Sequence, residues 1–119
     1  MDKNFVNVGE EAFLKNFGPE SHLGWEAFRS MALNRKREAV VDCASTPQSF
    51  NAGAILVLST LLADRLRRET SKKRVGIVLP SGIGAIIANF AAVFSGKSPV
   101  NLNFSLGREA LEASIERAE

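Results

Sequence analysis

The residues with the best spacing for binding chemistry follow a short apolar run near the middle of the chain. Ser81 and Gly82 come directly after that run, and Gly82-Ile-Gly84 opens the next apolar segment, as a dinucleotide-binding turn would. The third position of that motif requires Gly or Ala, but position 87 is Ile. The motif is therefore incomplete. Free N–H groups at this helix start could hold an anion, and a polar turn with a cap is the competing interpretation.

Two asparagines end the next predicted strand. Asn101 and Asn103 would lie at the carboxyl edge of a parallel sheet, where open α/β folds bind ligands. No acidic residue that could bind a ribose accompanies them, and turn formation is an alternative role for both side chains. The sequence predicts Ser81, Gly82, Asn101 and Asn103 as substrate-binding candidates. It indicates no catalytic residue.

Metal and nucleophile chemistry is not indicated. One histidine and one cysteine cannot form a metal site by themselves. His22 has no titratable neighbour in the sequence, so a capping or surface role is predicted. Asp42 beside Cys43 would disfavour the thiolate, which indicates an inert thiol. Trp25 is predicted to anchor the core, and the alternative is that it covers a surface meant for a missing part of the chain. We expect no metal and no cofactor in this segment.

Composition indicates an ordinary globular protein. The chain is 45% hydrophobic and 24% charged with a net charge of +2, which fits neither the disordered class nor a strongly basic nucleic-acid-binding class. Short basic groups at 35–37, 65–68 and 72–74 are typical of solvated helix ends. The single cysteine favours a reducing, cytoplasmic compartment. The longest apolar stretches of the chain are too short to cross a bilayer, so no membrane span is predicted.

Hydrophobic periodicity divides the chain into a lead-in at 1–20, which could include a short helix, and a single α/β subdomain at 21–119. Ser49 is placed to cap the longest helix, after a break at 45–48 that contains Pro47. The predicted helices are 22–37, 49–70, 82–95 and 107–119, and the predicted strands are 38–42, 75–79 and 99–102.

Strands that alternate with helices of this length need crossover connections, which predicts a parallel sheet. The expected architecture is a three-layer α/β fold with a short parallel sheet made of three βα units. The continuous apolar run at 75–79 predicts a strand that is buried on both faces, and the helix at 82–95 is apolar on nearly all sides, so it should be sandwiched. The predicted inward faces of the other two long helices are Ile55, Leu58, Leu62 and Leu66, and Ala110, Leu111, Ser114, Ile115 and Ala118.

Several of these segments resemble one enzyme superfamily. RVGIVLPS at 74–81, the helix that ends before Gly96, and SPVNLN at 98–103 resemble the AMP-forming acyl-CoA and acyl-carrier-protein synthetases. That family has a VGIxLPN strand and turn, an Ala/Phe-rich helix and a PVxLN strand, and Ser81 stands where Asn is commoner. QSFN at 48–51 resembles the family's Thr-Tyr helix start. The resemblance covers about 38–119, and NLNF at 101–104 is most similar to the 2-acylglycerophosphoethanolamine acyltransferase and acyl-carrier-protein synthetase branch.

The resemblance implies that this chain is the N-terminal piece of the large domain of such a ligase. The parent would use ATP and Mg to activate a fatty acid as an acyl-adenylate. It would then transfer the acyl group to a thiol, from CoA or acyl carrier protein, or to a lysophospholipid. The family's phosphate loop, adenine motif, ribose-binding Asp and catalytic Lys do not occur in this sequence. This segment is therefore expected to be an inactive scaffold whose partner is the remainder of the ligase chain. The parent would be cytoplasmic, with membrane association as an option.

Two other functions stay open at this point. A small flavodoxin-like or Rossmann-like module would bind a nucleotide or a partner at its strand ends, although no complete phosphate loop is present. An interaction fragment would self-associate through an exposed apolar face. Nucleotide-induced stabilisation would indicate the module, and concentration-dependent sedimentation would indicate self-association.

Overall fold

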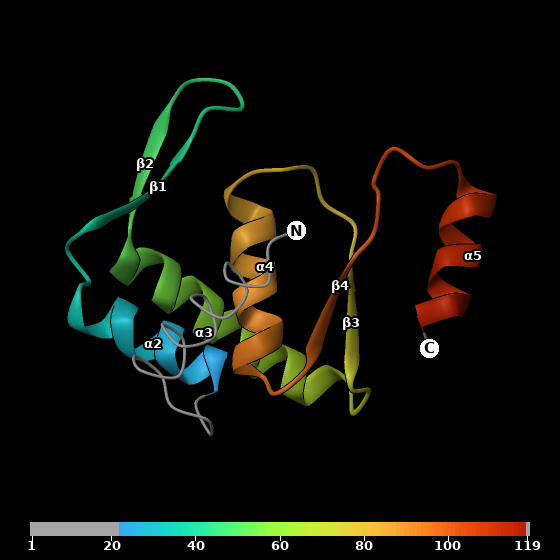
Figure 1. Ribbon diagram of the computed structural model, residues 1–119, viewed down its shortest axis with the longest axis horizontal. Helices are drawn as coiled ribbons and strands as arrows, with labels where there is room; N and C mark the ends of the chain where they lie inside the picture. The colour runs from blue at the N-terminus through green and yellow to red at the C-terminus, as the bar shows by residue number, and fades with distance from the viewer. Residues whose placement is uncertain (1–21, 119) are drawn as a thin grey trace, which may run out of the picture.

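The computed structural model describes residues 22–118, so the predicted lead-in at 1–20 lies outside the described residues. The described chain is α/β, with four helices and two small sheets, one of them parallel (Figure 1). In chain order the elements are α2 (Leu23–Leu33), β1 (Glu38–Asp42), β2 (Gln48–Asn51), α3 (Ala52–Glu69), β3 (Arg74–Ile77), α4 (Ile83–Phe94), β4 (Ser98–Asn101) and α5 (Arg108–Ala118).

The parallel sheet contains β3 and β4, which are joined by α4 as the strand–helix–strand pattern predicts. Arg74 pairs with Ser98, and Ile77 pairs with Asn101. Gly96 follows α4 with a φ of 77°, a left-handed conformation that glycine adopts without steric cost, so the predicted helix stop is confirmed. The end of α3 at Glu69, with Thr70 as C-cap, also agrees with the sequence.

The prediction that the first strand joins this parallel sheet is wrong. β1 pairs antiparallel with β2 as a separate hairpin (Figure 1). In its register Asp42 lies opposite Gln48. Only residues 43–47 connect the two strands, and a connection of this length suits a hairpin but is too short for a parallel crossover. The segment predicted as a break and helix cap therefore contains a strand.

The predicted cap of the longest helix is also wrong. Ser49 lies within β2, where its hydroxyl donates to the Glu38 carboxylate across the hairpin. Asn51 is the actual N-cap of α3, because its Oδ1 accepts a hydrogen bond from the Ala54 N–H at 2.8 Å. Both residues are common N-caps, and pairing between β1 and β2 moves the start of the helix two residues beyond Ser49.

The helix predicted at 22–37 ends earlier, at Leu33. Its basic triplet lies instead in the turn that leads to β1. The carbonyls of Arg35 and Arg37 accept hydrogen bonds from the N–H groups of Gly53 and Ala52, each at 2.9 Å. These bonds satisfy donors at the start of α3 that have no partner within the helix, and so they tie the turn to that helix.

The core lies mainly between α3 and α4, where small side chains allow close approach. The fully buried residues of these two helices are Ala52, Ile55, Ser59 and Ala63 in α3, and Ala91 and Ala92 in α4. Ile55 is buried as predicted, but Leu58, assigned to the same inward face, is 44% exposed. The burial therefore follows a narrower stripe than the apolar sequence of α3 suggested.

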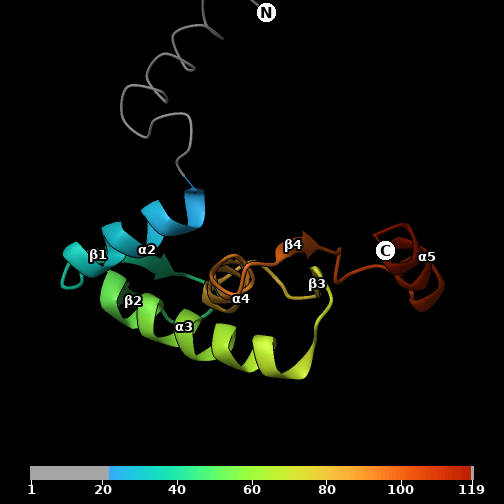
Figure 2. The same cartoon turned by 90° about the horizontal axis from the view of Figure 1, so that it is seen from below.

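The second face of the parallel sheet is less covered than the sequence predicted. Figure 2 shows α4 and α5 on opposite sides of β3 and β4. Ile77 is buried, whereas Val78 and Leu79 lie beyond the end of β3 and are exposed. α5 contains no buried residue, and of its predicted inward face Leu111, Ser114 and Ala118 are only half-buried. The expectation of a strand buried on both faces is wrong for the described residues.

Trp25 is not a core anchor, because 60% of its surface is exposed. Its ring stacks on Phe28, with centroids 6.1 Å apart, and Phe28 meets the edge of Phe94 at 5.6 Å. This aromatic row joins α2 to α4 at the surface. No helix among residues 22–118 is long and apolar enough to cross a membrane.

Candidate functional site

The turn between β3 and α4 carries two of the predicted binding residues, Ser81 and Gly82. Gly82 is the N-cap of α4, with φ 153° and ψ −173°, a combination that is nearly restricted to glycine. An added Cβ at this position would lie 3.0 Å from Oδ2 of Asp42. Gly82 is thus needed for backbone conformation and for the close approach of a carboxylate from the hairpin.

The carboxylate of Asp42 occupies the start of α4. Its Oδ2 accepts a hydrogen bond from the Ile83 N–H at 2.9 Å, and its Oδ1 accepts one from the Ala44 N–H at 2.9 Å. The hydrogen bonds from Ile83 and then Ala44 lower the pKa of Asp42 below its usual value, and partial burial opposes them weakly. A helix N-terminus favours such a negative charge. The position where an external anion could have bound is therefore taken by a side chain of the protein.

Sequence reasoning missed this role of Asp42. It treated the residue only as the end of a strand and as the neighbour of Cys43, which is exposed in the structure. Asp42 and Ile83 are 41 residues apart, and no local pattern connects them. The contact depends on the hairpin, which brings the end of β1 to the start of α4.

Asn101 lies at the carboxyl end of β4 and pairs with Asn89 of α4. Each Nδ2 donates to the Oδ1 of the other side chain at 2.9 Å, and Nδ2 of Asn89 also donates to the Ala85 carbonyl. Asn89, the single amide in a predicted apolar helix, thus fixes the crossover helix to the strand that follows it. The polar interruption in that helix was the available signal for this pair.

Asn103 forms a local turn. Its Oδ1 accepts hydrogen bonds from the Ser105 N–H at 3.0 Å and from the Ser105 hydroxyl at 2.7 Å. Turn formation was the alternative role for both asparagines, and Asn103 has this role in the structure. Among the four predicted residues, Gly82 thus lies close to the Asp42 carboxylate, Asn101 is bonded to α4, and Asn103 is held within its own loop, while Ser81 is exposed in the turn. Their binding of substrate stays a prediction.

His22 caps α2, as the sequence indicated. Its Nδ1 accepts a hydrogen bond from the Gly24 N–H at 3.1 Å. An added Cβ on Gly24 would lie 2.5 Å from Cγ1 of Val93, so α2 and α4 approach closely at this point. Within residues 22–118, no three His, Cys, Asp or Glu side chains come together as metal ligands would.

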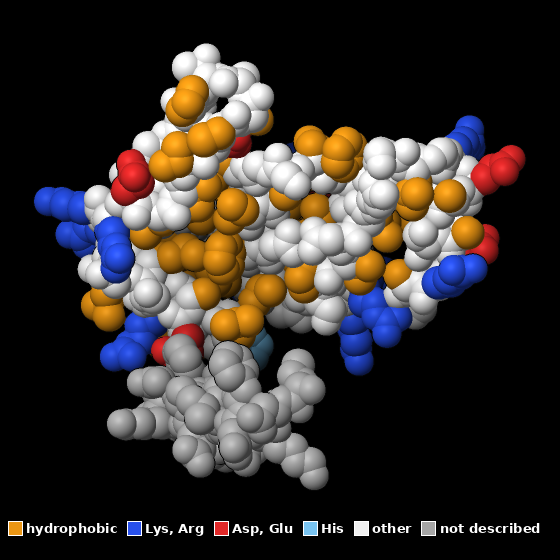
Figure 3. Space-filling view, turned by 45° about the horizontal axis from the view of Figure 1, so that its top comes forward, with side chains coloured by type: hydrophobic (Ala, Val, Ile, Leu, Met, Phe, Trp, Pro, Cys, Tyr) orange, Lys and Arg blue, Asp and Glu red, His pale blue; other side chains and the backbone are white. Residues whose placement is uncertain are grey.

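The basic groups lie apart on the face shown in Figure 3, where Lys and Arg side chains appear in separate groups at the margins of the molecule. Arg67 donates to the Phe94 carbonyl, and Lys97 donates to the carbonyls of Thr70 and Lys72, so two of these cations fasten α3 and its following loop to the end of α4. Arg65 with Glu69 and Arg68 with Asp64 form exposed ion pairs along α3.

Comparison of the chain with models of protein families, with curated proteins and with solved structures finds no match.

Proposed function

We propose that this chain is a scaffold segment of an ATP-dependent acyl ligase that activates a carboxylic acid as an acyl-adenylate. The carrying observation is that the segments with the family resemblance coincide with one structural unit. The strand pattern falls on β3, the Ala/Phe-rich pattern on α4, and the second strand pattern on β4, which is parallel to β3. Gly96, the predicted helix stop, has the required left-handed conformation.

The exposed apolar surface supports the proposal that this unit belongs to a larger domain. Twelve large hydrophobic side chains are exposed among the described residues, including Val78, Leu79 and Phe104 in the two loops that follow β3 and β4. Parallel sheets are normally covered on both faces, and two-stranded sheets are marginal by themselves. In the proposed parent, further chain would cover these surfaces and supply the groups that bind ATP and Mg and perform the chemistry.

The acyl acceptor in this proposal is a thiol, from CoA or acyl carrier protein, or a lysophospholipid. The isolated chain would be inactive because the described residues provide positioning and no acid–base pair. The role of Asn101 and Gly82 would be to hold the crossover helix and its turn beneath the substrate cleft, with Ser81 and Asn103 at the cleft's margin.

The nucleotide-binding module is less well supported. A phosphate at the start of α4 would meet the Asp42 carboxylate, which already accepts the Ile83 N–H. Two anions at one helix N-terminus repel each other, so binding there would require the hairpin to move away. We expect neither ATP nor NAD to raise the melting temperature of the chain, because a ligand stabilises only the state that it binds. A rise that saturates with either nucleotide would favour the module.

The native transcript around this segment provides the decisive test. We expect the reading frame to continue into a Ser/Thr/Gly-rich loop that ends in Lys. A stop codon directly after Glu119 would overturn the proposal. As a second measurement, ATP–pyrophosphate exchange with fatty acids should be undetectable for the isolated chain and present for the continued reading frame.

A further inference from the structure

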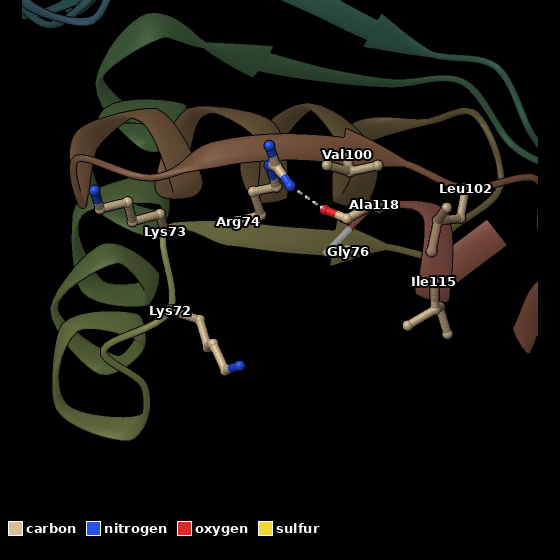
Figure 4. A pocket seen from close by; sticks show the side chains of 8 residues that line it. All are labelled: Lys72, Lys73, Arg74, Gly76, Val100, Leu102, Ile115 and Ala118. Atoms are coloured by element: carbon tan, nitrogen blue, oxygen red, sulfur yellow. Dashed lines mark hydrogen bonds between the residues drawn. The ribbon is translucent and has the colours of Figure 1, made fainter. Parts of the chain in front are cut away.

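The face of the parallel sheet that is turned away from α4 contains a hollow. A cavity of about 420 Å³ lies between this face and α5, and its size is that of a small-molecule site. Figure 4 shows Lys72 and Arg74 at one end of it, and Leu102 and Ile115 at the other. The hollow is separate from the α4 turn and from Asn101, and its argument is independent of the ligase proposal.

Strand geometry explains how this hollow forms. Successive side chains of a strand point to opposite faces, so Arg74 and Gly76 share the face opposite to that of Val75 and Ile77. Ile77 is buried on the α4 side. On the other side Gly76 contributes no side chain, and an added Cβ there would lie 3.3 Å from Cδ1 of Leu102. The missing side chain of Gly76 lets Leu102 lie close against this strand, where it forms part of the wall of the hollow.

α5 borders the hollow without filling it. Arg74 donates from its Nη1 to the Ala118 carbonyl at 2.6 Å, which links the end of α5 to the start of β3 (Figure 4). Ile115, on the facing side of α5, remains 43% exposed, and no residue of this helix is buried. A row of apolar surface from Val100 and Leu102 to Ile115 thus stays open beside a cationic end.

The charges at this end are of one sign. Lys72 and Arg74 lie there with Lys73 between them in the chain, and the lining includes no acidic residue. Among the described residues, the ammonium group of Lys72 has no hydrogen-bond or ion-pair partner. Arg and Lys donors are the groups that bind carboxylates and phosphates most strongly.

We propose that this hollow binds a small amphipathic anion, with its acidic group at Lys72 and Arg74 and its apolar body along Gly76, Val100, Leu102 and Ile115. The complementarity is of two kinds, in charge at one end and in apolar surface at the other. A neutral ligand would leave the Lys72 ammonium without a partner, and a purely polar anion would leave the apolar row in water.

Titration of the isotope-labelled chain with octyl phosphate, octanoate and octan-1-ol tests this proposal by amide NMR. We expect either anion to shift the amide signals of Gly76, Val100 and Ala118, and octan-1-ol to bind at least roughly tenfold more weakly because it lacks the charge-assisted hydrogen bonds. Tighter binding of octyl phosphate than of octanoate would identify a phosphate ligand, and the reverse order would identify a carboxylate. Equal binding of octan-1-ol, or no shift with either anion, would overturn the proposal.

Two variants at exposed positions locate the site, and their side chains are not part of the core. Lys72→Ala should weaken anion binding at least about threefold, the effect of removing a partly screened cation. Ile115→Asp should abolish binding by placing a negative charge in the apolar row. Lys36→Ala, which removes another exposed lysine outside the hollow, is the matched control and should bind like the wild type. Unchanged binding by both Lys72→Ala and Ile115→Asp would refute the assigned position.

Discussion

The two glycines at the start of α4 should respond to alanine in opposite directions. Gly82 has a φ of 153°, and an added Cβ would lie 3.0 Å from the Asp42 carboxylate. Gly84, two residues later and within the helix, has no atom within 4 Å of an added Cβ. A nucleotide-binding turn would need both glycines, the first for the tight turn and the second for close approach of the pyrophosphate, whereas the observed turn needs only the first one.

The expected magnitudes follow from these environments. Alanine at position 82 should lower the free energy of unfolding by about 1–3 kcal/mol from backbone strain, before the shift forced on Asp42 is included. Alanine at position 84 should raise it by up to about 1 kcal/mol, because alanine is the better helix former. For a domain of this size, 1 kcal/mol corresponds to about 4–8 °C in melting temperature. The two variants should therefore differ by about 1–4 kcal/mol, which is at least about 4 °C in melting temperature.

Thermal unfolding followed by circular dichroism measures this difference, with urea titrations to confirm it. The reasoning would be refuted if Gly82→Ala melted with the wild type, or if the two variants were destabilised equally. The same variants also test the function. If ATP raised the melting temperature of the wild type and Gly84→Ala removed that rise, a nucleotide-binding function would be favoured over the ligase-scaffold function.

Three further predictions concern single side chains. Ser59 is fully buried, and its hydroxyl has no hydrogen-bond partner among the described residues, so Ser59→Ala should stabilise the fold by about 1 kcal/mol. The control variant Thr60→Ala, at an exposed position, should change the stability little. Urea titrations that show Ser59→Ala to be destabilising would contradict this prediction. Because the pKa of Asp42 is lowered in the folded state, its charge stabilises the fold at pH values above the ordinary carboxyl pKa of 3.8. This stabilisation is lost as the pH falls through the lowered pKa. Wild type should thus melt above Asp42→Asn at neutral pH, and the gap should close in acid; a gap independent of pH would argue against the cap. Asn101→Ala leaves Asn89 without its reciprocal partner and should destabilise the fold by about 1 kcal/mol in chemical denaturation, while an unchanged midpoint would show that the pair contributes nothing.

The sequence was most informative where a short segment determines its own structure. The helix stop at Gly96 and the end of α3 near Thr70 follow from local residue types, and the parallel pairing of β3 and β4 follows from the length of the connection between them. These features need no knowledge of the rest of the chain, and the structure has all of them.

The sequence failed where a remote partner decides the outcome. The apolar segment Glu38–Asp42 has the same local pattern whether it pairs in parallel or antiparallel fashion, and the choice depends on whether residues 48–51 form a strand. Ser49 and Asn51 are both good helix caps, so local preference could not choose between them. The contacts of Asp42 with Ile83 and of Asn89 with Asn101 span 41 and 12 residues, which puts them beyond any periodicity argument.

Both proposals concern the open face of the parallel sheet, which either further chain or a small anion would cover. The apolar run of β3 predicts cover on both faces, yet only Ile77 of this strand is buried, and the face that carries Gly76 borders the hollow at α5. If further chain of a ligase covers that face, the anion should bind the isolated chain and lose its access in the longer protein. If the anion binds both with equal affinity, the hollow is a site of the mature protein and its cover must lie elsewhere. Titration of the isolated chain and of the longer protein with the same anion therefore distinguishes a binding site from a surface that further chain covers.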